Sequence, residues 1–252
     1  SQKDVIEATR ALTGWSNAEP DQMRASSNGF NYGKPMVANW ADGHDTGSKM
    51  VLGKAIPGGQ DAPKDLDSLV DILVNHPNTA PFVSLRLIQG LTTSDPSAAY
   101  LQRVATVFAK TRGNLGQVIR AILMDPEARA GDDPHKAHKG FGRIKEPHLL
   151  HTSWVRGLGC RLAVKQSWDP KQIWLAQSQA PFNAYSVFNF YPPNHRAPSS
   201  KLLAPEQKML NSNEFSRRMS DYHNAMSHNN LLSDAGCETA VFEAAARKSN
   251  EH

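Results

Sequence analysis

The chain has 252 residues, of which 39% are hydrophobic and 21% are charged. This composition is typical of a globular protein with a large core, at the upper end of one domain or the lower end of two. The net charge of +4 is modest and the basic residues are scattered, which argues against a nucleic-acid partner. No window approaches the ~18 consecutive apolar residues of a membrane span, and the start SQKDVIEATR does not resemble a signal peptide.

The only two cysteines are Cys160 and Cys237, and neither belongs to a CxxC or Cys/His cluster. A metal-thiolate centre is therefore excluded. A disulfide between the two and a pair of buried free thiols both remain open.

Residues 16–63 form the first irregular segment, because Gly, Asn, Asp and Pro occur throughout it. The pattern predicts a long loop with at most a small β-hairpin. Within it lie His44 and Asp45, which together are able to ligate a divalent metal or to act as a general base with its orienting partner. The alternative is structural, with Asp45 bonded to turn backbone and His44 to a carbonyl.

Residues 64–130 carry the helical core. One apolar stripe predicts a helix that ends at His76, because Pro77 biases the residue before it away from helical geometry. A new helix is expected to begin near Asn78 or Thr79. His76 is a second candidate for chemistry, since a helix C-terminus favours its cation. Its structural alternative is a helix C-cap. The residues of this stripe are Leu66, Leu69, Val70 and Leu73.

Two further helices are predicted, with a turn at Arg112 and Gly113 between them. Asp95 is expected to cap the first, because Pro96 fits a first helical turn. Asn114 is expected to cap the second, with Gln117 three residues on. Both stripes have the spacing of one buried helix face. The stripe residues are Leu101, Val104, Ala105 and Phe108 in the first helix, and Leu115, Val118, Ile119, Ile122 and Leu123 in the second.

Residues 180–200 form a second irregular segment, rich in aromatics and proline. Rings beside amides suit stacking on a sugar or lining of a ligand cleft. Anchoring of the chain on the helical core is the alternative. The candidate ligand-binding residues are Tyr185, Phe188, Asn189 and Tyr191. Before this segment, His135 and His138 are expected in a surface loop, and after it residues 205–226 return to a helical pattern, followed by a polar tail over 227–252.

Several blocks occur in the same order as in one known family. They are SQKDVIEATRALTGW, GHDTGSKMVLG, HPNTAPFVSLRLIQ, DPSAAYLQRVATVF, AILMDPEAR, IKEPHLL and PFNAYSVFNFYPP. Over roughly residues 1–225 the chain resembles the family called domain of unknown function 1800, and ordered multi-block agreement is more specific than a single motif.

The resemblance implies a bacterial, exported and mostly helical protein. Family members have a further helical segment before the ALTGW block, so residues 1–226 are expected to be a carboxy-terminal portion whose partner is the upstream portion of the same polypeptide. Members are often encoded beside sulfatase-like proteins, which makes such a protein a possible partner by association.

We therefore expect a mainly α-helical, multi-helix bundle with two long irregular excursions. For function, the first expectation is a metal-dependent enzyme, a hydrolase or oxidoreductase, with His44, Asp45 and His76 as catalytic residues and metal ligands. The second is a non-catalytic component of the cell envelope, or of an extracellular structure, that binds a glycan or protein or takes part in assembly. The third is a purely structural helical scaffold.

Overall fold

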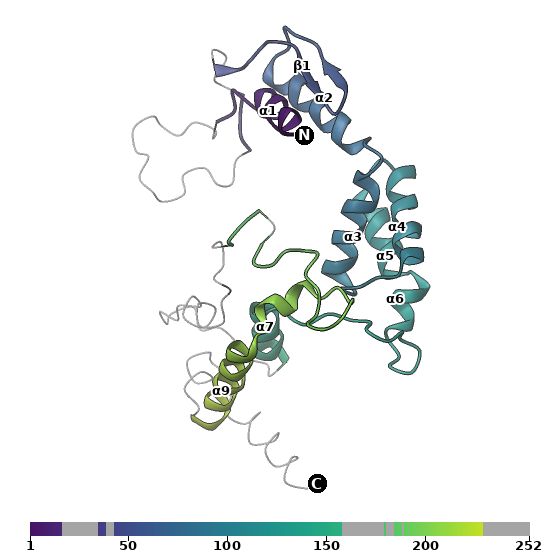
Figure 1. The fold of residues 1–252 in the computed structure, drawn as a ribbon, viewed down its shortest axis with the longest axis vertical. Coiled ribbons are helices and arrows are strands. Elements are labelled where there is room, and N and C mark those ends of the chain that lie inside the picture. Colours follow the sequence, from purple (N-terminus) through teal and green to yellow (C-terminus); the bar gives the residue numbers. More distant parts are fainter. Residues whose placement is uncertain (17–34, 39–42, 158–178, 180–183, 188, 229–252) are drawn as a thin grey trace. The chain divides into compact units, whose positions relative to one another are not determined.

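A computed structural model describes residues 1–16, 35–38, 43–157, 179, 184–187 and 189–228 (Figure 1). Within these residues are eight α-helices and one two-stranded antiparallel hairpin, so the chain is mainly α-helical, as predicted. The chain divides into two compact units, residues 1–85 with 101–121 and residues 86–100 with 122–252. Cys160 and Cys237 lie outside the described residues.

The first unit is built on a hairpin with helices packed against it. It contains α1 (Gln2–Ala11), β1 (Lys49–Val51), β2 (Lys54–Ile56) and α2 (Ala62–Val74). Burial alternates along β1, where Met50 is exposed between two buried residues. Period-two alternation of this kind buries one face of a strand. The small core of this unit consists of Ala11, Val51, Ile56 and Leu69, with Ala8 and Ile72 packed against it.

Helix α1 begins with a capping box that the sequence patterns above did not identify. The Ser1 hydroxyl accepts the Asp4 backbone N–H, and the Asp4 carboxylate accepts from the N-terminal ammonium at 2.8 Å. The other Asp4 oxygen accepts the Leu52 N–H at 2.8 Å, at the hairpin turn. This turn uses left-handed backbone at Leu52 and Gly53, with φ of 50° and 74°. A left-handed pair matches the twist of a two-residue hairpin.

The predicted break at Pro77 is confirmed. Helix α2 begins at its cap Asp61 and ends at Asn75, and α3 (Thr79–Leu91) begins four residues later. The Thr79 N–H donates to the His76 carbonyl at 2.9 Å, which closes the link between them. His76 therefore lies between two helices, where the sequence pattern placed it.

The predicted turn between α4 (Ala98–Lys110) and α5 (Leu115–Leu123) is also confirmed. Arg112 and Gly113 both have left-handed backbone, with φ of 50° and 78°. The Asn114 side chain accepts the Gln117 N–H at 3.1 Å, as expected of an N-cap. The prediction for the start of α4 is wrong by two residues, because Ser97 and not Asp95 accepts the Tyr100 N–H.

The predicted stripes are buried only in part. In α5, Val118 and Ile122 are fully buried, whereas Leu115, Ile119 and Leu123 are 38 to 55% exposed. In α2, Leu69 is buried but Val70 and Leu73 are exposed. In both helices the apolar stripe is wider than the face that neighbouring elements bury. The periodicity therefore predicted the helix correctly, but not which apolar residues of the stripe are buried.

The second unit contains helices that range from 5 to 17 residues in length. They are α6 (Pro126–Ala130), α7 (Pro147–Gly157), the 3-10 helix η2 (Pro205–Met209) and α9 (Ser212–His228). Tyr100 is fully buried here and its hydroxyl donates to the Ile122 carbonyl at 2.8 Å. The helical stretch expected over 205–226 is interrupted at Leu210 and restarts where the Asn211 side chain caps α9. None of the described helices has the length and apolar character needed to cross a membrane.

Candidate functional site

The polar loop before β1 is held by a buried cluster of His44, Lys49 and Asp65. The Asp65 side chain is fully buried at the start of α2, and one of its oxygens lies 2.5 Å from Lys49 Nζ and 3.3 Å from His44 Nε2. Its other oxygen accepts from the Gln60 amide at 2.8 Å. A buried carboxylate is tolerated when it has an opposite charge and hydrogen-bond donors around it. This cluster meets that requirement and ties the loop to α2.

The ring nitrogens of His44 and the ammonium of Lys49 all contact groups inside the protein. His44 Nδ1 lies 2.9 Å from the Thr13 carbonyl oxygen, which is an acceptor, so Nδ1 carries a proton and donates. The Lys49 ammonium donates to the carbonyls of Asp45 and Gly47 as well as approaching Asp65. The ammonium therefore has two carbonyl acceptors and one carboxylate counter-charge around it. These contacts match the structural reading of the GHDTGSK segment.

The Asp45 carboxylate, unlike its backbone, belongs to a different cluster, in which Arg10 lies between two carboxylates. Arg10 Nε and Nη2 donate to the two Asp45 oxygens at 2.7 and 3.1 Å, and Nη1 donates to Glu7 at 2.9 Å. The Arg10 hydrogen bonds, followed by the Gly47 N–H, lower the pKa of Asp45 from 3.8 to about 2. The bidentate fork fixes Asp45 as an ion-pair partner of α1.

Gly47 lies close against this ion pair. A Cβ at Gly47 would lie 2.7 Å from Arg10 Nη2 and 3.0 Å from Asp45 Oδ1. A side chain at this position would therefore have to displace the end of the Arg10 side chain.

His76 lies in a separate setting, at the end of α2. Its Nδ1 accepts the Asn78 N–H at 3.2 Å. Within the described residues, no recorded contact joins His44, Asp45 and His76 to one another, and no group of three or more His, Cys, Asp or Glu side chains there is arranged to hold a metal ion. The common metal centre remains a sequence prediction.

The aromatic segment divides into an exposed part and an anchored part. Tyr185 is 75% exposed and packs edge to face against Phe190, with ring centroids 5.7 Å apart. Asn189 has left-handed backbone, and its N–H donates to the Ser186 carbonyl at 3.0 Å, which closes a turn. Phe188, the fourth residue predicted to bind ligand with Tyr185, Asn189 and Tyr191, lies outside the described residues.

Tyr191 is an anchor. Its hydroxyl donates to Glu146 Oε1 at 2.7 Å. Burial, followed by the hydrogen bond to Glu146, raises the pKa of Tyr191 far above its usual value of 10. The hydroxyl therefore stays protonated and holds the segment on the start of α7.

Glu146 is the centre of a polar network in the second unit. Arg143 lies between two buried carboxylates, 2.9 Å from Glu146 and 3.3 Å from Glu206. The other Glu146 oxygen accepts from Gln179 at 2.6 Å, and Glu206 accepts from Ser94 at 2.8 Å. Every one of these carboxylate oxygens has a donor or cation beside it. The network is therefore expected to stabilise the fold of this unit.

A second polar group surrounds Glu127 on α6. One Glu127 oxygen accepts the Ser97 N–H at 2.9 Å and lies 3.3 Å from His138 Nε2, and the other accepts the Ser97 hydroxyl. These residues line a depression of about 440 Å³. Since the Ser97 oxygen also accepts the Tyr100 N–H, Ser97 caps α4 and the distant Glu127 carboxylate holds Ser97 in place.

Asp65, Glu146 and Glu127, the centres of these polar clusters, were not among the residues predicted from the sequence. A signal existed for Asp65, because Asp65 and Leu69 are four residues apart and share the buried face of α2. Glu146 and Glu127 are polar residues at helix starts, and most of their partners are 30 or more residues away; Arg143 and His138 are the nearer ones. Local patterns carry no information on such partners.

No curated protein and no solved structure matches this chain. One family model does, and it matches residues 1–250. Its description is "Protein of unknown function (DUF1800)". The match covers nearly the whole chain and agrees with the order of sequence blocks, and the chain therefore belongs to the DUF1800 family.

Proposed function

We propose that this protein is a non-catalytic binding component of the bacterial cell envelope, and that the turn containing Tyr185 and Val187 contacts a protein partner. The observation that carries the proposal is the exposure of apolar side chains on this turn. Tyr185 is 75% exposed and Val187 is 95% exposed. Burying such surface against a partner contributes about 25 cal/mol per Å².

The packing of Tyr185 supports a role in recognition. Its ring meets Phe190 at an interplanar angle of 81°, which limits the orientations it can adopt. Tyrosine is enriched among the interface residues that contribute most to affinity, because it brings a large contact area at a small entropic cost. A constrained, exposed tyrosine suits that use.

Val187 favours a protein over a glycan as the partner. A sugar ring stacks on an aromatic face and bonds to amides, which Tyr185 and Asn189 offer, but it gains little from a protruding isopropyl group. An apolar pocket on a protein surface would bury Val187 together with Tyr185. Glycan binding is therefore the alternative outcome of the test below.

The metal-dependent enzyme is the weaker proposal. A metal bound by His44 would have to displace Thr13 or Asp65 from the imidazole. A metal bound by Asp45 would have to displace Arg10 from the carboxylate. The envelope location is itself part of the proposal, and it follows from the export signals of family members.

Site-specific photocrosslinking in native cells tests the proposal. A benzophenone amino acid is placed at Val187 and, as a matched control, at Leu115, which is 55% exposed on α5. We expect a single protein adduct from position 187, none from position 115, and loss of the adduct when Tyr185→Ala is added. Equal adducts at both positions, or none at 187, would overturn the proposal.

Two further readouts separate the alternatives. Retention on immobilised envelope glycans that Tyr185→Ala abolishes, without a protein adduct, identifies a glycan partner instead. A stoichiometric metal in untagged protein that His44→Ala removes identifies the metal-dependent enzyme.

A further inference from the structure

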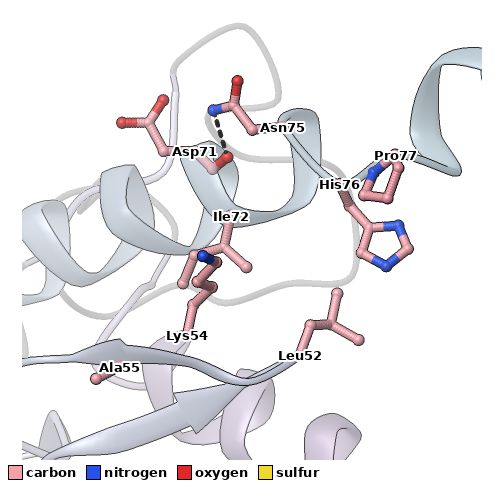
Figure 2. A pocket seen from close by; sticks show the side chains of 8 residues that line it. All are labelled: Leu52, Lys54, Ala55, Asp71, Ile72, Asn75, His76 and Pro77. Carbon is pink, nitrogen blue, oxygen red and sulfur yellow. Dashed lines mark hydrogen bonds between the residues drawn. The ribbon is translucent and has the colours of Figure 1, made fainter.

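A depression of about 590 Å³ lies between the hairpin turn and the end of α2 (Figure 2). Its walls combine apolar surface with a few polar groups, as is usual for small-molecule sites. The apolar lining consists of Leu52, Ala55, Ile72 and Pro77, and the polar lining of Lys54, Asp71, Asn75 and His76.

His76 offers a single hydrogen-bond donor of fixed identity. Because its Nδ1 accepts the Asn78 N–H at 3.2 Å, the proton of the neutral ring is on Nε2. Figure 2 shows the imidazole on the side of α2 where Leu52 lies. Nε2–H is therefore available to a ligand acceptor in the depression.

Lys54 supplies a positive charge. Its ammonium has no ion pair or hydrogen bond recorded with the residues that the structure describes, and Figure 2 shows the side chain extending from β2 toward Ile72. Asp71 projects from the other side of α2 in the same view, and its carboxylate lies 3.6 Å from Arg112. Of these two charged side chains, Lys54 is therefore the one that faces the apolar wall of the depression.

The position at a helix C-terminus limits the charge of the ligand. The carboxyl end of α2 carries a partial negative charge, which disfavours an anion and more so a multiply charged one. A single lysine suits the one charge of a carboxylate better than the two charges of a phosphate.

We propose that this depression binds a carboxylate attached to a short aliphatic group. The carboxylate accepts from Lys54 Nζ, the aliphatic group packs on Leu52 and Ile72, and His76 Nε2–H is a second donor at the Leu52 end of the depression. Both a free short-chain acid and the last residue of a polypeptide ending in an aliphatic side chain have this chemistry. The proposal is independent of the partner-binding turn containing Tyr185 and Val187.

Ligand-observed saturation-transfer NMR on the full chain tests this site. The probes are hexanoate for a free acid, N-acetylleucine for a chain end, and hexanamide as the neutral counterpart. We expect the two acids to bind and hexanamide to bind about tenfold more weakly, since one charge-assisted interaction is lost. The stronger of the two acids identifies the source of the carboxylate.

Substitutions locate the binding. Lys54→Gln on the exposed strand β2 is expected to weaken hexanoate binding about tenfold, whereas the control Lys64→Gln near the start of α2 leaves it within about twofold. Both variants should keep the parent unfolding temperature. Equal binding of hexanoate and hexanamide, equal effects of the two substitutions, or no saturation transfer to either acid would overturn the proposal.

Discussion

Asp65 is the residue on which the buried polar contacts of the first unit converge. Its two oxygens meet Lys49, His44 and Gln60, and its side chain is fully buried. The histidine that the sequence presented as a candidate for catalysis is therefore one of three side chains that contact a buried carboxylate. The chemistry visible in GHDTGSK is used to hold a long loop on a helix.

Replacement of Asp65 by Ala should cost about 3 to 5 kcal/mol of unfolding free energy, because Lys49 would be left buried without its counter-charge. Replacing both members, as Lys49→Met with Asp65→Leu, should cost less than Asp65→Ala alone. Denaturant titration gives these free energies. As a control, Asp71→Ala breaks a pair whose side chains are 71 and 72% exposed and should cost at most about 1 kcal/mol. Equal losses for Asp65→Ala and Asp71→Ala would contradict the buried-pair explanation.

Asp45 makes folding sensitive to acid. Its pKa is 3.8 ordinarily and about 2 in the folded protein, so the unfolded chain binds the proton first as the pH falls. The stabilisation is complete above pH 3.8 and is lost as the pH falls through about 2. Asp45→Asn should therefore flatten the fall in unfolding free energy over this window. Chemical denaturation from about pH 5 to about pH 2 measures it.

Asp67→Asn is the control for this pH dependence, because Asp67 is exposed on α2 and has no recorded ion pair within the described residues. It should leave the slope unchanged. A slope in Asp45→Asn that equals the parent slope would show that the Arg10 pair contributes nothing to acid stability.

At the scale of elements, boundaries could be predicted better than buried faces. The break at Pro77 and the turn at Arg112 and Gly113 depend on local backbone chemistry, which the residues themselves specify. The start of α4 was placed two residues too early, because Asp95 and Ser97 are both favourable N-cap residues; the contact that distinguishes Ser97 is with Glu127, 30 positions away. The same limit applies to Ile119, whose exposure depends on what packs against α5.

The connection from α6 to α7 depends on a glycine at its beginning. A Cβ at Gly131 would lie 1.9 Å from Phe141 Cε1, so Gly131→Ala must displace the Phe141 ring. Overpacking of this kind costs about 1 to 3 kcal/mol, which denaturant titration would detect. Gly90 on α3 is the matched control. An added Cβ meets nothing there within 4 Å, and Gly90→Ala should be neutral or stabilise by up to about 1 kcal/mol. A Gly131→Ala variant as stable as Gly90→Ala would show that Phe141 moves aside freely.

At the scale of the whole molecule, the polar networks join residues that are far apart in the sequence. The network around Glu146 includes Ser94, Arg143, Tyr191 and Glu206. The pattern of rings and amides in residues 180–200 identified an important segment but could not separate its roles. Tyr191 and Tyr185 are alike by type, and only the long-range contact with Glu146 distinguishes the anchor from the exposed ring.

Substitutions at Tyr191 and Tyr185 should have different effects, because Tyr191 contributes to stability and Tyr185 to partner binding. Tyr191→Phe leaves Glu146 without one donor, and a hydrogen bond to a charged group contributes about 1.5 to 3 kcal/mol, so the unfolding free energy should fall by that amount. Tyr185→Phe removes the same atom from a 75% exposed ring and should change stability by less than about 0.5 kcal/mol.

Tyr185→Ala should also leave the fold intact, but it should abolish crosslinking to the partner. Denaturant titration of the three variants beside the crosslinking assay measures both properties. A loss of stability in Tyr185→Ala as large as that in Tyr191→Phe would make the exposed ring a part of the core, and the partner-binding proposal would then lose its main support.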